Sequence, residues 1–204
     1  MKILLFGPQG SGKGTQAELL SKKLGVPSIS VGDLLRNTKG KLKEKIDSIL
    51  KEGKLVPTEI VVEILKKRIK KDDCKKGFII DGFPRNLEQA ESIKKIFSPD
   101  KVIELVLSEE ECIKRITGRR ICSKCGKNFN IYTELKPKKE GICDFCGGEL
   151  KIREDDLDEK AIKRRLEIYY KETKPLLEFY KDKLVSIDGK GTAEEVFRRI
   201  ENIL

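Results

Sequence analysis

The sequence contains no histidine, the side chain that most often acts as a general base near neutral pH. Chemistry that depends on an imidazole is therefore excluded, and any reaction must use other groups. Phosphoryl transfer to an acceptor that is already anionic meets this condition, because positioning and charge neutralisation can drive it without a base.

Long apolar runs are also missing. No stretch of the 204 residues approaches the roughly 20 apolar residues of a membrane-spanning helix. The chain starts directly with the apolar run 2–6, which lacks the pattern of a signal peptide. We therefore expect a cytoplasmic protein without membrane attachment, and its length suits one domain with a sizeable core and small insertions.

Acidic residues are outnumbered by basic ones: 34 Asp and Glu stand against 44 Lys and Arg, which gives a net charge of +10. Such an excess favours a polyanionic partner, either nucleotide phosphates or a nucleic acid. The alternative is a set of lysine-rich helix faces in contact with water, and much of the lysine fits that description.

One glycine-rich stretch organises the chain: GPQGSGKGT, from Gly7 to Thr15. It follows the apolar run 2–6, which indicates a buried strand, and precedes apolar residues at helical spacing. This order predicts a phosphate-binding loop, in which backbone N–H groups, a helix N-terminus and Lys13 face one anion. Gly14 separates Lys13 from Thr15, which puts the usual Mg²⁺ contact of that hydroxyl in doubt. The alternative is a tight turn with a surface lysine.

Apolar strand patterns alternate with helical patterns along the rest of the chain. Such alternation predicts an α/β fold, with a parallel sheet covered by helices on both faces. Pro175 is expected to bend or split the longest helix. The expected strands are 2–6, 26–31, 77–81, 101–107 and 184–187, and the expected helices are 16–24, 32–36, a segment within 37–56, 58–70, 87–97, 108–117, 158–180 and 192–203.

Polar residues follow the strand 77–81 in the order Asp81-Gly82-Phe83-Pro84-Arg85. Open α/β sheets bind ligands at the carboxyl ends of their strands, so this segment is a second candidate for the site. The alternative is a helix-capping aspartate beside a surface arginine.

Two Cys-x-x-Cys pairs, each followed by a glycine, predict a structural zinc site. Four thiolates would complete the zinc tetrahedron and leave no open position for catalysis. Zinc would stabilise a segment that has too few apolar residues for a core of its own. Disulfides are the alternative, and Cys74 and Cys112 fall outside the pattern. The four predicted ligands are Cys122, Cys125, Cys143 and Cys146.

Together these segments resemble the adenylate kinase family of nucleoside monophosphate kinases, in its long-lid, metal-binding bacterial type. The resemblance implies Mg²⁺-dependent, reversible phosphoryl transfer from ATP to AMP, which gives two ADP. It also implies a monomer with structural Zn²⁺ and no nucleic-acid or membrane partner. It covers essentially the whole chain and is carried by Gly7 to Gln16, Ser30 to Arg36, Asp81 to Arg85 with Gln89, Gly118-Arg119-Arg120, the two cysteine pairs and Arg153-x-Asp155-Asp156.

The resemblance further implies a P-loop fold in three α/β/α layers around a five-stranded parallel sheet. The core would comprise residues 1–29, 57–117 and 157–204. Two mobile insertions would flank it: a monophosphate-binding arm at residues 30–56, and a zinc-binding lid at residues 118–156 that closes over ATP.

The same resemblance assigns the nucleotide-binding residues. ATP would contact Gly10, Ser11, Gly12, Lys13, Gly14, Thr15, Arg115, Arg119, Asn128, Phe129 and Gly191, with Arg115 stacked on the adenine. AMP would contact Val31, Arg36, Lys54, Leu55, Val56, Gly82, Phe83, Pro84, Arg85, Gln89, Arg153 and Arg165, with Gln89 at the base edge. Lys13, Arg85, Arg119, Arg153 and Arg165 would be catalytic, because a complex with five phosphates needs clustered cations. Asp33 and Asp81 would orient Mg²⁺ through water.

The sequence departs from the family pattern at three single positions. Val31 and Phe129 replace a threonine and a lid tyrosine, and Asn86 follows Arg85 where threonine is usual. The Arg85-Asn86 pair is closer to the pyrimidine nucleotide kinases, and Val31 lacks the hydroxyl of threonine.

A fourth departure is one of length. The segment from Asp156 to Leu166 is one residue longer than usual, so two arginines compete for one site position. Arg165 is the better match because it directly precedes Leu166, and Arg164 is the alternative.

Two other functions stay open at this point. A UMP/CMP-type kinase would share the fold, and Val31 and Asn86 leave the acceptor base open. A zinc-ribbon nucleic-acid binding protein would use the +10 charge, but stacking on bases needs exposed aromatic residues. The cysteine segment offers only Phe129, Tyr132 and Phe145, and nucleic-acid binding does not explain the phosphate loop.

Overall fold

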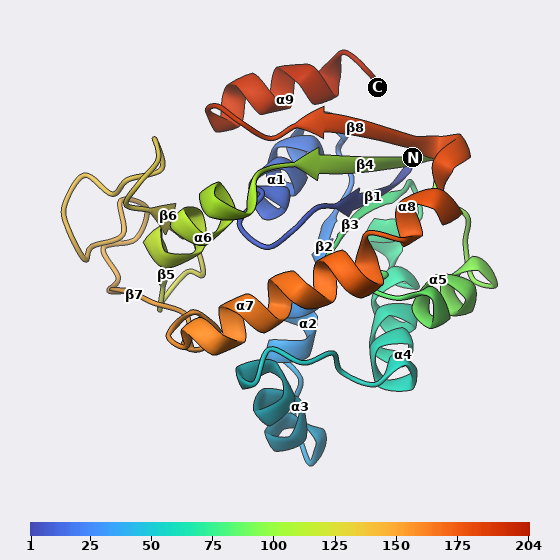
Figure 1. Ribbon diagram of the computed structural model, residues 1–204, viewed down its shortest axis with the longest axis horizontal. Coiled ribbons are helices and arrows are strands. Elements are labelled where there is room, and N and C mark those ends of the chain that lie inside the picture. The colour runs from blue at the N-terminus through green and yellow to red at the C-terminus, as the bar shows by residue number, and fades with distance from the viewer.

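The computed structural model describes all residues from Met1 to Leu204. Five parallel strands form the central sheet in the order β2-β3-β1-β4-β8 (Figure 1), so the predicted five-stranded parallel sheet is confirmed. None of the helices is both long and apolar enough to cross a membrane. The strands are β1 (Lys2–Phe6), β2 (Ser28–Ser30), β3 (Phe78–Asp81), β4 (Lys101–Val106) and β8 (Leu184–Asp188).

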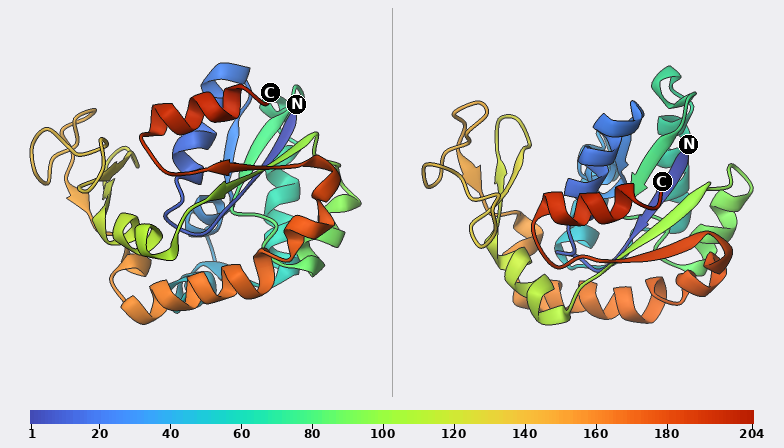
Figure 2. Two further views of the ribbon diagram at one scale, coloured as in Figure 1. Left: turned by 45° about the horizontal axis from the view of Figure 1, so that its top comes forward. Right: turned by 90° about the horizontal axis from the view of Figure 1, so that it is seen from above.

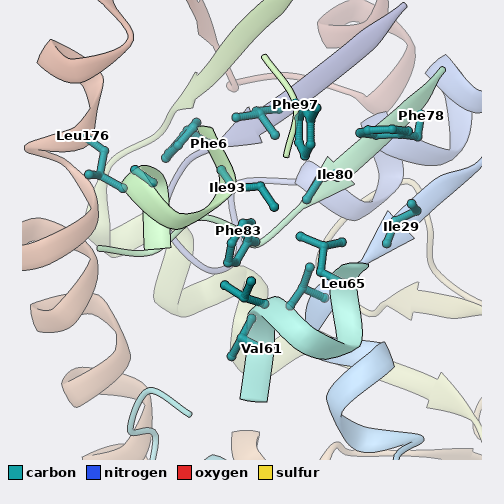
Figure 3. Packing of buried hydrophobic residues seen from close by; sticks show 14 of the residues in the cluster. Phe6, Ile29, Val61, Leu65, Phe78, Ile80, Phe83, Ile93, Phe97 and Leu176 are labelled. Carbon is teal, nitrogen blue, oxygen red and sulfur yellow. The ribbon is translucent and has the colours of Figure 1, made fainter. Parts of the chain in front are cut away.

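Successive side chains of β1 point to opposite faces of the sheet, and both faces are covered. Ile3 and Leu5 pack under α1 (Lys13–Leu24) and α9 (Ala193–Glu201). Leu4 and Phe6 face the other layer, in which α4 (Thr58–Ile69), α5 (Leu87–Lys94) and α8 (Leu176–Phe179) cover the sheet (Figures 1 and 3). This arrangement confirms the three-layer α/β/α architecture.

The strand order places β1 at a reversal of the sheet. From β1 the chain builds β3 and β2 on one side, and later adds β4 and β8 on the other. Open α/β sheets bind ligands outside the carboxyl end of the strand at such a reversal. The glycine loop follows β1 directly, so the topology puts this loop where a ligand is expected.

Two segments between the strands carry secondary structure of their own, and they are named here by their residues. The arm, residues 30–56, holds α2 (Val31–Arg36) and α3 (Leu42–Lys51), and its Ile46 is fully buried in the same apolar cluster as Leu4 and Phe6 of β1. The cysteine lobe, residues 118–156, lies apart from the central sheet in each view (Figures 1 and 2). It follows α6 (Glu109–Gly118) and holds the antiparallel strands β5 (Arg119–Cys122), β6 (Asn128–Asn130) and β7 (Leu150–Lys151).

The long helix expected at 158–180 is divided into three parts. A regular helix, α7 (Glu159–Ile168), is followed by a π-helical turn at Tyr169–Thr173, in which Lys174 N–H donates to the Tyr169 carbonyl at 2.7 Å. Pro175 then precedes α8. The predicted split at Pro175 is therefore present, but the regular helix already ends at Ile168. Elsewhere the element ends lie within about three residues of the expected ones, as is usual for helix and strand ends.

Candidate active site

A single cleft of about 890 Å³ opens beside the carboxyl ends of the strands, and every residue predicted to contact a nucleotide or Mg²⁺ lines it. The cleft lies between the core, the arm, the cysteine lobe and α7. It brings together segments as far apart in the sequence as Gly10 and Gly191. The sequence interpretation gave no role to several further lining residues, including Glu18, Glu134, Asp155, Tyr169 and Thr173.

The glycine loop forms an anion cradle because its backbone takes conformations that favour glycine. Gly7, Gly10 and Gly12 have φ values of 139°, 85° and 95°. A Cβ on Gly10 would lie 2.5 Å from the Cys112 carbonyl oxygen, so the loop can pass α6 closely only with glycine there. The N-cap residue of α1, Gly12, makes no side-chain cap, which leaves the first N–H groups of the helix available to an anion.

Lys13 lies inside this cradle, and its Nζ donates to the carbonyl oxygens of Gly7 at 2.7 Å and Pro8 at 2.8 Å. Burial lowers the pKa of the Lys13 ammonium, and the Asp81 carboxylate opposes that shift. Burial likewise raises the pKa of Asp81, opposed by Lys13. Each charge therefore offsets part of the cost of burying the other, although no hydrogen bond joins the two groups.

Of the two predicted Mg²⁺ residues, Asp81 fits the role better. Its Oδ1 is buried without a hydrogen-bond partner, and a Cβ on Gly14 would lie only 3.6 Å from its Oδ2. One carboxylate oxygen thus approaches the phosphate loop and the other is buried without a partner, so the group suits waters bound to Mg²⁺. Asp33 is exposed and binds Arg36 at 2.6 Å, so its carboxylate is already engaged.

Four arginines converge on two buried aspartates of the cysteine lobe. Asp155 accepts hydrogen bonds from Arg153 and from Arg165 at 2.9 Å, and Arg36 lies 3.9 Å away. Burial alone would raise the pKa of Asp155, but the hydrogen bond and charge of Arg153, with Arg165 and Arg36, hold it well below its usual range. Asp155 therefore stays ionised and fixes the guanidiniums around it.

The second aspartate, Asp156, accepts from Arg119 Nε at 2.7 Å and from Arg165 Nη2 at 2.8 Å. Neither aspartate was predicted as a site residue. A signal was present in the sequence, because three consecutive acidic residues, 154–156, follow Arg153 directly.

Arg85 has no carboxylate partner within hydrogen-bond distance. Its Nε donates to the Gly82 carbonyl at 2.9 Å. Burial and the nearby Arg36, Arg165 and Arg153 lower the pKa of Arg85 to about 10, although Asp81 opposes the shift. The guanidinium is thus charged at neutral pH and surrounded by positive charge, so the cleft favours an anion at this point.

The two neighbouring arginines of α7 that compete for one site position differ in their burial. Arg165 is 6% exposed and lines the cleft. Arg164 is exposed, and its Nη1 donates to the Glu52 carbonyl at 3.0 Å, at the C-terminal end of α3. The geometry therefore favours Arg165 over Arg164 for the site position, and the role of Arg165 stays a prediction.

One end of the cleft carries the residues assigned to the acceptor base. Asn86 is the N-cap of α5, and its Oδ1 accepts from Gln89 N–H at 2.9 Å. Gln89 is buried, and its Oε1 accepts from Arg85 N–H at 2.9 Å, which leaves its Nε2 free to donate. Val31 is an apolar wall, 2% exposed. Asn86 therefore builds the helix start, and Gln89 presents a donor to the cleft.

At the opposite end, Arg115 is held beside Gly191. Its Nε donates to Glu111 at 3.0 Å, and Nη1 and Nη2 lie 3.3 and 3.5 Å from the carbonyl oxygens of Gly189 and Gly191. These contacts fix the plane of the guanidinium, as stacking on a base requires. Phe129 lines the cleft from the core of the cysteine lobe, where it is 5% exposed.

The four predicted zinc ligands form one compact cluster, with all sulfur atoms within 4.8 Å of one another. A Zn–S bond of about 2.3 Å places the sulfurs of a tetrahedral site about 3.8 Å apart, and the Cys122–Cys146 and Cys125–Cys143 sulfurs lie 3.4 and 3.6 Å apart. The backbone N–H of Cys125 lowers the pKa of Cys122; the Gly148 N–H acts in the same direction on Cys146, but the neighbouring sulfurs outweigh it and raise the pKa of Cys146. Sulfurs this close together ionise fully only when a bound cation offsets their charges. No disulfide forms, and the cluster fits structural zinc.

We expect about one zinc ion per purified chain, measured by elemental analysis. Cys143→Ser should lose that zinc and lower the melting temperature, because the lobe has only a small apolar core. Cys74→Ser, which changes a cysteine outside the cluster, should keep it. Zinc-free protein with an unchanged melting temperature would contradict the assignment.

Asp155→Asn should lower the free energy of unfolding at pH 7 by about 2 kcal/mol, because hydrogen bonds to charged groups are lost. The pKa of Asp155 is lower in the folded chain than in the unfolded one. Its contribution is therefore present above about pH 4 and is lost as the pH falls further. The difference between wild type and variant should shrink in urea unfolding below pH 4.

The control for that experiment is Asp47→Asn, which removes only a surface pair with Lys43. It should change the free energy of unfolding by less than about 0.5 kcal/mol at either pH. A constant difference between wild type and the Asp155 variant from pH 7 to pH 3.5 would disprove the coupling.

Known proteins resemble this chain along its whole length. A model of the family described as "Adenylate kinase" matches residues 5–185. An adenylate kinase of Caldicellulosiruptor saccharolyticus is 46% identical over 202 residues, which cover 95% of this chain and 93% of that protein. Adenylate kinases of Geotalea daltonii (45% identity; 100% and 99% covered) and Methanocella arvoryzae (45%; 96% and 94%) are similarly close. With the loop, the arginine cluster and the cysteine site in place, the chain belongs to the adenylate kinase family.

Proposed function

We propose that the protein catalyses reversible, Mg²⁺-dependent transfer of the terminal phosphoryl group of ATP to AMP, giving two ADP. The observation that carries the proposal is the gathering of five cationic side chains in one cleft, together with the glycine loop and the residues assigned to both nucleotides. Membership of the adenylate kinase family and the names of the relatives support the same reaction. The five side chains are Lys13, Arg85, Arg119, Arg153 and Arg165.

The donor nucleotide is assigned to the glycine loop. The amides from Gly10 to Thr15 and the ammonium of Lys13 bind the ATP phosphates, and Arg115 supports the adenine together with Asn128, Phe129 and Gly191. Mg²⁺, when bound with ATP, withdraws negative charge from the phosphates. Asp81 would hold the waters of the ion, and Asp33 could assist only by giving up part of its contact with Arg36.

The acceptor is assigned to the other end. Arg36 and Arg85 bind the AMP phosphate, whose oxygen is already ionised and needs no general base. This explains how the reaction proceeds in a protein without histidine. The nucleoside lies against Val31 and Gln89, with the remaining contacts from Lys54, Leu55, Val56, Gly82, Phe83 and Pro84.

Charge that develops on the transferring group is stabilised by Arg119, Arg153 and Arg165. Their planar guanidiniums match phosphate oxygens in pairs, and the ion pairs with Asp155 and Asp156 fix their orientation before substrate arrives. Little reorganisation is then needed during transfer, which is the main source of electrostatic catalysis.

We also propose that residues 118–156 act as a lid and residues 30–56 as a closing arm on the core of residues 1–29, 57–117 and 157–204. Two contacts support the lid: Lys127 pairs with Glu18 of α1 at 2.7 Å, and Glu134 accepts from Ala193 N–H of α9 at 2.6 Å. Closure would exclude water and prevent transfer to it. A monomer in the cytoplasm completes the proposal, and the free thiols that zinc requires suit a reducing compartment.

The alternatives are not favoured. The Asn86 side chain caps the start of α5. Its resemblance to the pyrimidine nucleotide kinases therefore gives no argument about the acceptor base. For nucleic-acid binding, Phe129 is buried and only Tyr132 and Phe145 are exposed in the cysteine lobe. Two separate aromatic residues offer a poor stacking surface.

Lys13→Ala should lower kcat at least a hundredfold, because roughly 3 kcal/mol of transition-state stabilisation is lost. A coupled assay of ADP formation measures this, and circular dichroism checks the fold. Lys22→Ala, an exposed lysine of the same helix, is the control and should stay near wild type. Near-normal turnover in the Lys13 variant would refute the assignment.

Gln89→Leu should lower kcat/KM for AMP about tenfold or more, since it removes the Nε2 donor that faces the base. Val31→Thr should change it less than about threefold, because the wall keeps its shape. A donor at this position pairs with N1 of adenine or N3 of cytosine and opposes the N–H of guanine and uracil. Assays with all four monophosphates should rank AMP first and CMP above UMP and GMP; a preference for UMP would contradict this reading.

A further inference from the structure

Thr173 makes a contact that none of the assigned roles uses. It is buried, 7% exposed, and its Oγ1 donates to the backbone carbonyl of Arg85 at 2.7 Å across 88 residues of sequence. Both residues line the cleft. The bond therefore joins the helical segment that follows α7 to the loop that carries the acceptor-phosphate arginine.

The direction of this hydroxyl depends on the π-helical turn at Tyr169–Thr173. A threonine inside a regular helix commonly bonds to the carbonyl four residues before it. Here that carbonyl, of Tyr169, accepts from Lys174 N–H at 2.7 Å, so the turn contains one residue more than an α-helical turn. Thr173 bonds outside its own helix instead, and such wide turns are frequent at functional sites.

The turn is anchored at its other end by Tyr169. Its hydroxyl donates to Glu104 of β4 at 3.3 Å, and Ser186 of β8 donates to the same carboxylate at 2.7 Å. Burial and the adjacent Glu104 raise the pKa of Tyr169, so its hydroxyl keeps its proton and stays a donor. These bonds attach the π-helical turn to the central sheet. The turn therefore cannot shift together with the loop that carries Arg85.

Arg85 is held at three points by its surroundings. Its N–H donates to Gln89, its Nε donates to Gly82, and its carbonyl accepts from Thr173. The first two contacts come from the same loop and helix, 82–89. Only the third ties Arg85 to a different part of the chain, the segment that also carries Arg165 eight residues earlier.

We propose that Thr173 is a positioning residue for the acceptor phosphate. By holding the Arg85 carbonyl, it sets the distance between Arg85, which binds AMP, and Arg165, which faces the transferring group. The inference rests on the proposed function. It assigns Thr173 to the acceptor side alone, because no donor-side residue bonds to Thr173 or to the carbonyl it holds.

The test uses Thr173→Val, Thr173→Ala and Thr173→Ser in the full-length, zinc-loaded protein. Valine and alanine remove the hydroxyl, and we expect kcat/KM for AMP to fall about five- to tenfold, as loss of one well-placed hydrogen bond implies. KM for ATP should stay within about twofold. Serine keeps the hydroxyl and should restore AMP kinetics to near wild type.

A matched control separates positioning from general stability. Ser21→Ala removes another hydroxyl that donates to a backbone carbonyl, that of Val26 at 2.6 Å, far from the acceptor site. It should lower the melting temperature as much as Thr173→Ala does and leave KM for AMP unchanged. If Thr173→Val fails to fold, the alanine and serine variants decide the question.

Equal losses for ATP and AMP, or a lower melting temperature with wild-type AMP kinetics, would overturn the inference and leave the proposed function standing. A wild-type protein that does not phosphorylate AMP would overturn the proposed function, and the inference with it.

Discussion

The site depends on holding positive charge in place without neutralising it. Asp155 and Asp156 bind guanidiniums from the arm (Arg36), from β5 (Arg119) and from α7 (Arg165). Each ion pair has a fixed geometry because the carboxylates are buried, and buried pairs with several hydrogen bonds are far more specific than surface ones. The cluster holds more arginines than aspartates. It therefore keeps a net positive charge, which attracts phosphate groups.

The same cluster connects parts of the chain that share little else. The arm, the cysteine lobe and α7 each contribute a residue to it, whereas their apolar cores are separate. The arm shares its apolar cluster with the central sheet, α7 packs on α6, and the cysteine lobe has a small cluster of its own. The ion pairs are therefore what joins these three parts on the cleft side, and the order of the cationic cluster depends on how the parts are placed relative to one another.

Features encoded by short spacings could be predicted from the sequence. The glycine loop, the two cysteine pairs and the strand ending at Asp81 each depend on residues within about ten positions, and the structure contains all three. The small sheet of the cysteine lobe was missed, because its strands are short and polar and the cysteine sulfurs replace the usual apolar alternation. The π-helical turn was missed because a single inserted residue leaves no periodic pattern.

Other details could not be derived without tertiary context. Asn86 was considered as a determinant of the acceptor base, but its Oδ1 accepts a hydrogen bond from Gln89 N–H at the start of α5. Gln89 was assigned to the base edge, and Arg85 N–H already bonds to its Oε1, so the Nε2 donor is the group left fully free. In both cases the residue type was informative, and the competing local hydrogen bond decided what remained for the ligand.

The two carbonyl oxygens that hold Lys13 also bear on how a nucleotide binds. An ammonium has three N–H donors, and the carbonyl oxygens of Gly7 and Pro8 accept from two of them. The third donor is left for a phosphate oxygen. Because the two carbonyls already hold the side chain in place, little of its rotational freedom remains to be lost when a nucleotide binds.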